Sequence, residues 1–463
     1  MIDEDIMKLR FYQKEIVDAQ NEWLSSNRQR GSVYAPTGSG KTFCFSNMIK
    51  EAMSRGMKNI LVVHPRIALS IDQQTRFLDH FSGIPFTGFH SGEAVQSLGD
   101  FVNTTTTNRE TLVEIIAAAQ AVPASGFHIT FSSYASLHKI ADMNFDLIIC
   151  DEAHYLTQAA LSVSLDLFKS KVMFYTATPI YNDKGVSMDN RDLFGNVEAD
   201  IEPKRLIESG YVLAPRLRFL DVAANITDED GMVDPAMMIA EAFRDQAAQL
   251  NEGINCKMLV AMPATTEFEN IVSKLPEIRE LCGDIDVYYV TASMSRKNAG
   301  RGETNRAKTL DAFQSSTKPS IIIHCDTLSE GIDVDGMTGA FIFRTLTKAK
   351  FMQTVGRCAR PLKADMDDNG DVIDMANRIK PNCLITIPTV NGDFYGNIDA
   401  QWLCEVFAAG GYDEITTMLS AEQKERKGSS NPEGVDPIED MIYEAVIDAE
   451  VREVKLDLEQ FMV

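Results

Sequence analysis

The sequence predicts an α/β protein built from two tandem, doubly wound parallel sheets. Short continuous apolar runs, typical of strands buried on both faces, alternate with helix-length segments along most of the chain. A Gly-rich loop follows the first of these runs. The alternation starts again near residue 235, without a second loop of this kind. Such an alternation of strands and helices indicates a parallel sheet covered by helices, once in each half of the chain.

The bulk composition fits this fold class. With 463 residues and 44% hydrophobic content, the chain is long enough for two or three globular domains. No apolar run approaches the length of a membrane span, and the acidic start lacks the regions of a signal peptide. The eight cysteines are scattered without a Cys-x-x-Cys pair, which favours buried thiols over a disulfide scaffold or a zinc site. We therefore expect a cytoplasmic protein with no membrane partner.

The charge is unevenly distributed. The chain has 44 basic and 67 acidic residues and a net charge of −23, which by itself argues against a nucleic-acid partner. However, residues 365–463 hold 22 acidic and 7 basic residues, a net charge of −15. Residues 1–364 carry only −8. Local basic patches in the body of the protein can therefore still bind phosphates.

The Gly-rich loop, residues 33–42, reads Val-Tyr-Ala-Pro-Thr-Gly-Ser-Gly-Lys-Thr and precedes a helix predicted from Phe43 to Met53. This is the layout of a phosphate-binding loop (P-loop), in which glycines let successive backbone N–H groups point at phosphate oxygens. The helix N-terminus adds a partial positive charge. The first glycine of the usual pattern is replaced by Ala35. Lys41 is expected to contact the β- and γ-phosphates, and Thr42 to bind Mg²⁺. The predicted nucleotide contacts are Pro36, Thr37, Gly38, Ser39, Gly40, Lys41 and Thr42.

Before the loop, the segment Leu-Arg-Phe-Tyr-Gln at residues 9–13 opens an amphipathic helix that continues to about Trp23. The amide of Gln13 can donate to and accept from one adenine edge at the same time. A surface glutamine on a helix is the alternative. After the loop, residues 59–64 form a buried strand that ends at Pro65, which places Arg66 at the edge where open α/β sheets bind ligands.

Further elements of the first half follow in order. Residues 67–81 and 114–120 read as helices, and residues 128–134 as a strand. A buried strand at 145–150 runs directly into Asp-Glu-Ala-His at 151–154. Asp151 can hold Mg²⁺, and Glu152 can orient and deprotonate the attacking water. The next strand, 172–175, brings Thr176-Ala177-Thr178 to the same edge. A looser region then ends at a predicted domain boundary near Ala214.

The second half repeats the pattern. A helix from Pro235 to Gln249 begins at the N-cap Asp234. A later helix carries Arg357 and Arg360, whose spacing of three predicts a shared helix face. This face is either a solvated surface or an arginine finger that reaches the γ-phosphate when the domains close. The predicted strands are 257–262, 286–290, 320–325, 340–343 and, closing the sheet, 384–387.

The ordered motifs resemble those of superfamily II helicases. The resemblance runs from Leu9 to Arg360 and is closest to DEAH-bearing DNA helicases and translocases: phage UvsW-type helicases, the XPB helicase and restriction motor subunits. The Thr-Ala-Thr motif and Gln353 favour this group over DEAD-box RNA helicases. The motifs are Ala-Pro-Thr-Gly-Ser-Gly-Lys-Thr at 35–42, Asp-Glu-Ala-His at 151–154, Thr-Ala-Thr at 176–178, Ser-Glu-Gly-Ile-Asp at 329–333 and Gln-x-x-Gly-Arg-x-x-Arg at 353–360.

The resemblance implies two RecA-like domains that use ATP and Mg²⁺, and it assigns roles to matching residues. Gln13 would read adenine, and Gly331 and Asp333 would join the nucleotide site. Gln353, Arg357 and Arg360 would act in hydrolysis with Lys41 and Glu152. His154, Thr176 and Thr178 would couple the nucleotide site to a single-stranded DNA track across both domains. Residues of that track would be Pro65, Arg66, Thr130, Ser133, Thr265 and Thr291. The basic stretch Ser295 to Lys308 either extends the track or forms a solvated helix-and-loop face.

The expected organisation is an ATP-binding helicase domain at 1–214, a second helicase domain at 215–395 and an acidic C-terminal extension at 396–463. Only about eight residues precede the opening segment, so no N-terminal DNA-binding domain is expected. Residues 401–419 read as a helix. The last segment is either a packed, solubilising end or a nucleic-acid mimic that restrains the motor, and the extension offers a surface for partner proteins.

The predicted function is that of an ATP-dependent DNA helicase or translocase, with forked or branched DNA and branch migration suggested by family analogy alone. An RNA-dependent ATPase, a motor subunit of a restriction-type complex and an ATP-gated clamp that does not unwind are the alternatives. No nuclease signature follows residue 365, so a restriction role would need another subunit.

Overall fold

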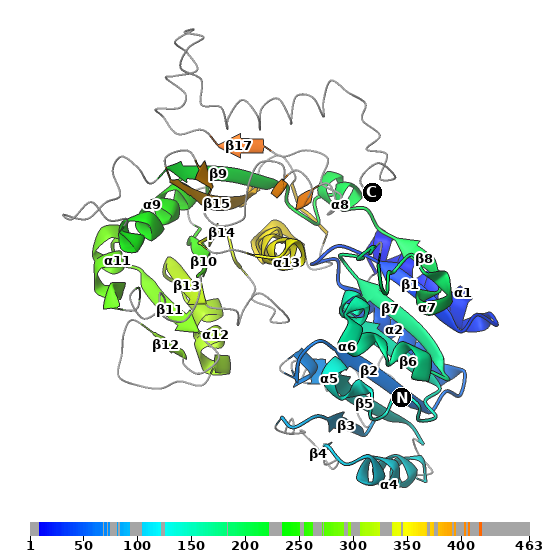
Figure 1. The fold of residues 1–463 in the computed structure, drawn as a ribbon. Coiled ribbons are helices and arrows are strands. Elements are labelled where there is room, and N and C mark those ends of the chain that lie inside the picture. The colour runs from blue at the N-terminus through cyan, green and yellow to red at the C-terminus, as the bar shows by residue number, and fades with distance from the viewer. Residues whose placement is uncertain are drawn as a thin grey trace. The chain divides into compact units, whose positions relative to one another are not determined.

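The computed structural model divides the chain into two compact units, which we call unit 1 (up to Glu202) and unit 2 (from Pro203). Each is an α/β unit built on its own sheet (Figure 1). The structure describes residues 9–67, 69–71, 73, 74, 81, 84–92, 104–121, 126–182, 184–221, 234–250, 254–262, 271, 273–290, 295–297, 306–324, 336–343, 346–367, 371–374, 378–390, 393, 394, 402, 403, 406, 407 and 416–418.

Some predictions fall outside the described residues. They concern Gly331, Asp333, Thr265, Thr291 and nearly all of the 396–463 extension. Among the described residues, no helix is long and apolar enough to cross a membrane.

Within the described part of unit 1, eight strands form one parallel sheet in the order β4-β3-β5-β2-β6-β7-β1-β8. The strands are β1 (Arg30–Tyr34), β2 (Asn59–His64), β3 (Phe86–Phe89), β4 (Thr104–Thr106), β5 (His128–Ser133), β6 (Leu147–Asp151), β7 (Lys171–Thr176) and β8 (Asn196–Asp200). The helices are α1 (Phe11–Ser25), α2 (Lys41–Ser54), α4 (Arg109–Gln120), α5 (Tyr134–Leu137), α6 (Ala159–Ser162) and α7 (Arg191–Phe194), with short 3₁₀ turns η1 (Ala153–Thr157) and η2 (Leu165–Leu167).

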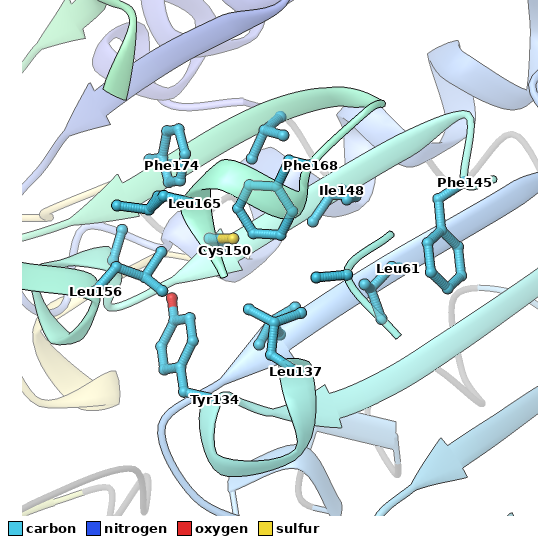
Figure 2. Packing of buried hydrophobic residues seen from close by; sticks show 14 of the residues in the cluster. Leu61, Tyr134, Leu137, Phe145, Ile148, Cys150, Leu156, Leu165, Phe168 and Phe174 are labelled. Atoms are coloured by element: carbon cyan, nitrogen blue, oxygen red, sulfur yellow. The ribbon is translucent and has the colours of Figure 1, made fainter. Parts of the chain in front are cut away.

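Helical elements cover both faces of this sheet. On one face, side chains of β2, β6 and β7 pack with α4, α5, η1 and η2 in a single buried cluster, part of which surrounds Cys150 in Figure 2. Phe174 of β7 belongs to this cluster, whereas the next residue, Tyr175, contacts Phe45 of α2 at 5.5 Å between ring centroids. Successive strand residues point to opposite faces, so α2 lies on the other side. The doubly wound sheet is therefore confirmed.

Unit 2 holds a second, mainly parallel sheet, whose described strands follow the order β12-β11-β13-β10-β14-β15-β9-β17, with β16 paired to β15. Strands β12 and β16 are antiparallel to their neighbours. The strands are β9 (Pro215–Asp221), β10 (Lys257–Ala261), β11 (Asp286–Val290), β12 (Ser295–Lys297), β13 (Ser320–His324), β14 (Gly339–Ile342), β15 (Cys383–Val390), β16 (Asp393–Phe394) and β17 (Thr416–Met418). The helices are α8 (Pro203–Glu208), α9 (Pro235–Ala247), α11 (Leu275–Cys282), α12 (Arg306–Ser315) and α13 (Lys348–Cys358), with the turn η3 (Lys363–Asp365).

Strand β9 was missed by the sequence prediction, and β15 does not close the sheet, because β9 and β17 lie beyond it. Arg216 and Arg218 interrupt the apolar run of β9. Arg218 is nevertheless buried, since its Nε donates to Asp245 Oδ2 of α9 at 2.8 Å. The prediction of a helix through residues 416–418 was wrong, because this segment pairs with β9 as a strand.

The contact boundary between the units falls before α8, earlier than the boundary predicted near Ala214. The segment after α8 is bound to unit 2 by hydrogen bonds. Leu213 N–H donates to the Ala359 carbonyl at 2.7 Å, and the Tyr211 hydroxyl donates to Asp371 Oδ1 at 2.7 Å.

Candidate functional site

The Gly-rich loop of unit 1 joins β1 to α2 and is tied to the sheet at its start, where Ala35 N–H donates to the Thr176 carbonyl at 3.0 Å. Gly38 and Gly40 have φ angles of 86° and 82°, a region that side chains with a Cβ rarely adopt. Gly40 is the N-cap of α2, which therefore begins at Lys41. The loop thus delivers the N–H groups of a helix N-terminus, an arrangement suited to anions such as phosphate.

Lys41 is buried inside this loop. Its ammonium donates to the carbonyls of Ala35 at 3.1 Å and Pro36 at 3.4 Å, while Ser39 N–H donates back to Pro36 O at 3.1 Å. The loop therefore curls around the cationic group, which concentrates positive charge at the α2 N-terminus.

Helix α1 contacts the loop and the following helix α2 through two buried glutamines. Gln13 Nε2 donates to the Ser39 carbonyl at 3.1 Å, and its Oε1 accepts from Arg10 N–H at 3.1 Å. A Cβ on Gly40 would lie 2.5 Å from Gln13 Nε2, so a side chain at this position would displace the Gln13 amide. The nitrogen and the oxygen of the Gln13 amide therefore both form hydrogen bonds with backbone groups. The role of Gln13 in reading adenine stays a prediction.

Gln20, the second of these glutamines, was missed by the sequence analysis. Its Nε2 donates to the Cys44 carbonyl of α2 at 2.8 Å, and its Oε1 accepts from the Tyr175 hydroxyl at 2.6 Å. It follows Gln13 by seven residues, which places both on one face of α1. This seven-residue spacing is the sequence signal that could have identified Gln20.

Asp151 ends β6 at the carboxyl edge of the sheet and is 6% exposed. Its Oδ1 accepts from Glu152 N–H at 3.0 Å, and its Oδ2 lies 3.4 Å from His64 Nδ1 of β2. Its backbone carbonyl accepts from the Tyr134 hydroxyl at 2.7 Å. The Glu152 N–H group and His64 therefore contact the carboxylate, and Tyr134 holds the backbone of the same residue.

Glu152 has φ 51° and ψ 50°, and it is the one non-glycine residue with positive φ in the described part of the chain. This left-handed conformation costs a residue with a Cβ about 1–2 kcal/mol. It turns the chain sharply from β6 into η1 and leaves the Glu152 side chain 17% exposed. Backbone strain of this kind concentrates at functional sites.

His154 links this turn to the end of β7. Its Nδ1 lies 3.0 Å from Thr176 Oγ1 and 3.4 Å from Thr178 Oγ1. Burial, followed by the charge of Lys41, lowers the pKa of His154 to about 4, so the ring is neutral at pH 7. Since the Thr176 carbonyl also accepts from Ala35, the predicted coupling residues form a hydrogen-bonded path to the Gly-rich loop.

The oxygen donors at this edge fit a magnesium ion. Thr42 offers a hydroxyl and Asp151 a carboxylate, the hard ligands that Mg²⁺ prefers alongside phosphate oxygens and water. Within the described residues, no group of three or more His, Cys, Asp or Glu side chains could hold a metal by itself. Thr42 Oγ1 also accepts from Gln73 Nε2 at 3.1 Å, a contact that the sequence did not predict.

In unit 2, α13 carries Gln353 and Arg357, which are 6% and 7% exposed. The alternative of a solvated Arg357 is therefore not supported. Arg360 lies past the end of α13 at Cys358, so the predicted helix face shared with Arg357 was wrong. The helix stops where the buried ammonium of Lys380 donates to the carbonyls of Cys358 and of Arg360, the latter at 2.8 Å.

Two of the predicted nucleic-acid contacts need correction. Thr130 and Ser133 are 0% and 3% exposed within β5, which is buried along its whole length. Thr130 Oγ1 lies 3.4 Å from His128 Nδ1, so the hydroxyl satisfies an interior histidine. By contrast, Arg66 is exposed and Pro65 half-buried at the carboxyl end of β2.

Two buried histidines make the stability of unit 1 dependent on pH. Burial lowers the pKa of both His128 and His154 to about 4, whereas an unfolded histidine titrates near about 6.5. The folded state thus binds fewer protons, so stability is complete above pH 6.5 and falls as the pH drops towards 4, by up to about 1.4 kcal/mol per pH unit for each histidine. Urea unfolding of the full chain between pH 7 and 5 measures this slope. His128→Gln makes it shallower by about one proton, and an unchanged slope contradicts the prediction.

Part of the chain is similar in sequence to known proteins. The family described as "Type III restriction enzyme, res subunit" matches residues 6–181. A probable helicase of African swine fever virus is 28% identical over 245 residues, which cover 51% of this chain and 26% of the viral protein. The family match lies within unit 1, and the viral relative matches about half of this chain. The chain spans about a quarter of the length of that relative.

Solved structures show the same fold. The DNA-bound Type ISP restriction-modification enzyme LlaBIII aligns with a TM-score of 0.68 at 16% identity, over 96% of this chain and 33% of that one. Mss116p bound to single-stranded RNA and AMP-PNP aligns with a TM-score of 0.55 at 14% identity, over 95% and 77%. The predicted tandem RecA-like fold is therefore confirmed.

Proposed function

We propose that this protein is an ATP-dependent nucleic-acid motor, a DNA helicase or translocase. The observation that carries the proposal is the set of groups at the carboxyl edge of the unit 1 sheet. The Gly-rich loop, the Asp151–Glu152 pair and the His154–Thr176 contact come from three different strands and meet at that edge. This combination serves phosphate binding, water activation and relay of the nucleotide state.

The chemistry follows from the side chains. Lys41 and the N–H groups at the α2 N-terminus bind the β- and γ-phosphates. Thr42 and Asp151 would hold Mg²⁺, which neutralises charge on these phosphates when bound. Glu152 orients the attacking water and accepts its proton. His154 is neutral at pH 7, and its Nδ1 lies 3.5 Å from Glu152 Oε2 and in contact with Thr176 and Thr178, so it transmits changes at Glu152 to the end of β7.

Finer assignments extend this proposal. The motif order supports Gln353, Arg357 and Arg360 as further groups in hydrolysis, with Gly331 and Asp333 in the nucleotide site. Exposed Arg66 is a phosphate contact for the nucleic-acid strand. The Thr-Ala-Thr motif and Gln353 support a DEAH-type DNA helicase, and LlaBIII is itself bound to DNA. A forked or branched substrate is proposed by family analogy alone. The acidic 396–463 segment is proposed as a surface for partner proteins.

The deciding experiment is steady-state ATP hydrolysis with single-stranded DNA and RNA of equal length, followed by strand displacement on forked, Holliday-type and blunt duplexes. We expect DNA to stimulate hydrolysis more than RNA, and forked DNA to be opened or remodelled. Stimulation by RNA alone would replace the DNA motor with an RNA-dependent ATPase. Absence of stimulation by either polymer would refute a nucleic-acid motor.

A further inference from the structure

Gln73 lies in a helical segment after β2, in which residues 67, 69–71, 73 and 74 are helical. Its side chain is 5% exposed and reaches the start of α2, where Nε2 donates to Thr42 Oγ1 at 3.1 Å. Thr42 precedes Gln73 by 31 residues, so only the fold brings them together. This side chain therefore touches the hydroxyl that the proposed function assigns to Mg²⁺.

The other end of the Gln73 amide is unusual. Oε1 is buried and has no hydrogen-bond partner in the described residues. Leaving a buried acceptor unsatisfied is costly, and such groups in a native structure call for an explanation. The adjacent Gln74 is a useful contrast, because its Nε2 contacts Ser70 Oγ at 3.2 Å and His90 Nε2 at 3.0 Å. Gln74 therefore has a structural role, whereas Gln73 keeps an unsatisfied acceptor near Thr42, a predicted metal ligand.

The chemistry of an amide explains this arrangement. Donation from Gln73 Nε2 occupies one lone pair of the Thr42 hydroxyl and fixes the direction of the other. Mg²⁺ keeps several water ligands in protein sites, and those waters need acceptors in the surrounding shell. The Oε1 atom of Gln73 is a buried acceptor of this kind, and it belongs to the same amide group whose Nε2 contacts the Thr42 hydroxyl.

We propose that Gln73 is a positioning residue for Mg²⁺: its Nε2 aims the Thr42 hydroxyl, and its Oε1 accepts a hydrogen from the hydrated cation. The proposal rests on the proposed function, since Thr42 is a metal ligand only if the loop binds a nucleotide–metal complex. It adds a residue outside the motifs that the sequence singled out. Removal of the amide should weaken metal affinity by about 10-fold or more, as for other groups that orient metal ligands.

The test measures Mn²⁺ binding to the full chain by electron paramagnetic resonance, with ATPγS as the nucleotide. Gln73→Leu is expected to bind Mn²⁺ about 10-fold more weakly, with nucleotide affinity in the absence of metal unchanged. Gln73→Glu keeps the size, replaces the Nε2 donor with an acceptor for the Thr42 O–H, which still fixes the direction of that hydroxyl, and adds negative charge. It should therefore bind Mn²⁺ as tightly as the unaltered protein or more tightly. Gln74→Leu is the matched control, because it removes a neighbouring buried amide that does not contact Thr42.

Thermal unfolding of all three variants separates metal positioning from loss of fold. If Gln73→Leu does not fold, Gln73→Glu alone decides, and a Mn²⁺ affinity well below that of the unaltered protein overturns the proposal. Equal affinities for Gln73→Leu and the unaltered protein also overturn it, while the motor function stands. If the unaltered protein binds no Mn²⁺–ATPγS, the proposed function fails and this inference fails with it.

Discussion

Replacing Glu152 by glutamine is expected to stop ATP turnover while ATP still binds. The glutamine has the same shape and keeps the strained left-handed turn at φ 51°, so the backbone cost is equal in both proteins. Only the proton-accepting carboxylate is lost. Removal of a positioned general base lowers rates by about 10²–10⁴-fold. The measurements are steady-state ATP hydrolysis and equilibrium binding of a fluorescent ATP analogue.

The loss of hydrolysis expected for Glu152→Gln is specific to this residue, because the surroundings of Glu152 differ from those of Asp151. Asp151 is held by His64, Tyr134 and the Glu152 N–H group, as expected of a metal ligand. Glu152 is the more exposed of the two side chains, as a residue that meets water must be. Glu114→Gln on the exposed side of α4 is the matched control and should leave hydrolysis unchanged. Hydrolysis by Glu152→Gln at the unaltered rate would remove Glu152 from its assigned role.

Replacing Lys380 by methionine is expected to destabilise unit 2 by about 3 kcal/mol. The Lys380 ammonium is 0% exposed and donates to the carbonyls of Met337 at 2.6 Å, Arg360 at 2.8 Å and Cys358. Burial lowers the pKa of this group, and the three carbonyls supply the compensating contacts. Methionine fills a similar volume but leaves those carbonyls without a donor, two of them at the end of α13.

Urea unfolding of the full chain measures this effect. A chain with two compact units can unfold in two steps, and the loss should appear in one of them only. Lys318→Met is the matched control, because Lys318 is half-exposed and its pair with Asp284 lies at the surface. Surface pairs contribute about 0–1 kcal/mol, so that variant should unfold close to the unaltered protein. Equal destabilisation by both variants would contradict the role of Lys380 as a helix cap.

Several polar side chains were missed by the sequence analysis for one common reason. Gln20, Gln73 and Lys380 are polar residues with distant partners, which lie 24 and 155 positions away for Gln20, 31 for Gln73 and 20–43 for Lys380. Apart from the seven-residue spacing of Gln20 from Gln13, nothing in the surrounding sequence distinguishes them from surface residues. For Thr130 and Ser133 the error was the opposite, since the resemblance placed them on a nucleic-acid track, whereas the fold buries both residues. Strand β9 was missed because its arginines find partners only after folding.

The sequence by itself determined the α/β class, the doubly wound sheet of unit 1 and the placement of the Gly-rich loop and Asp151–Glu152 at strand ends. These are local properties, because a strand buried on both faces must be a continuous apolar run and its chemistry must follow at its carboxyl end. Only the tertiary structure decided the strand order, the strain at Glu152 and which buried amides and ammonium groups hold the loop and α13. Those depend on contacts between residues far apart in sequence, where desolvation makes every unpaired polar group costly.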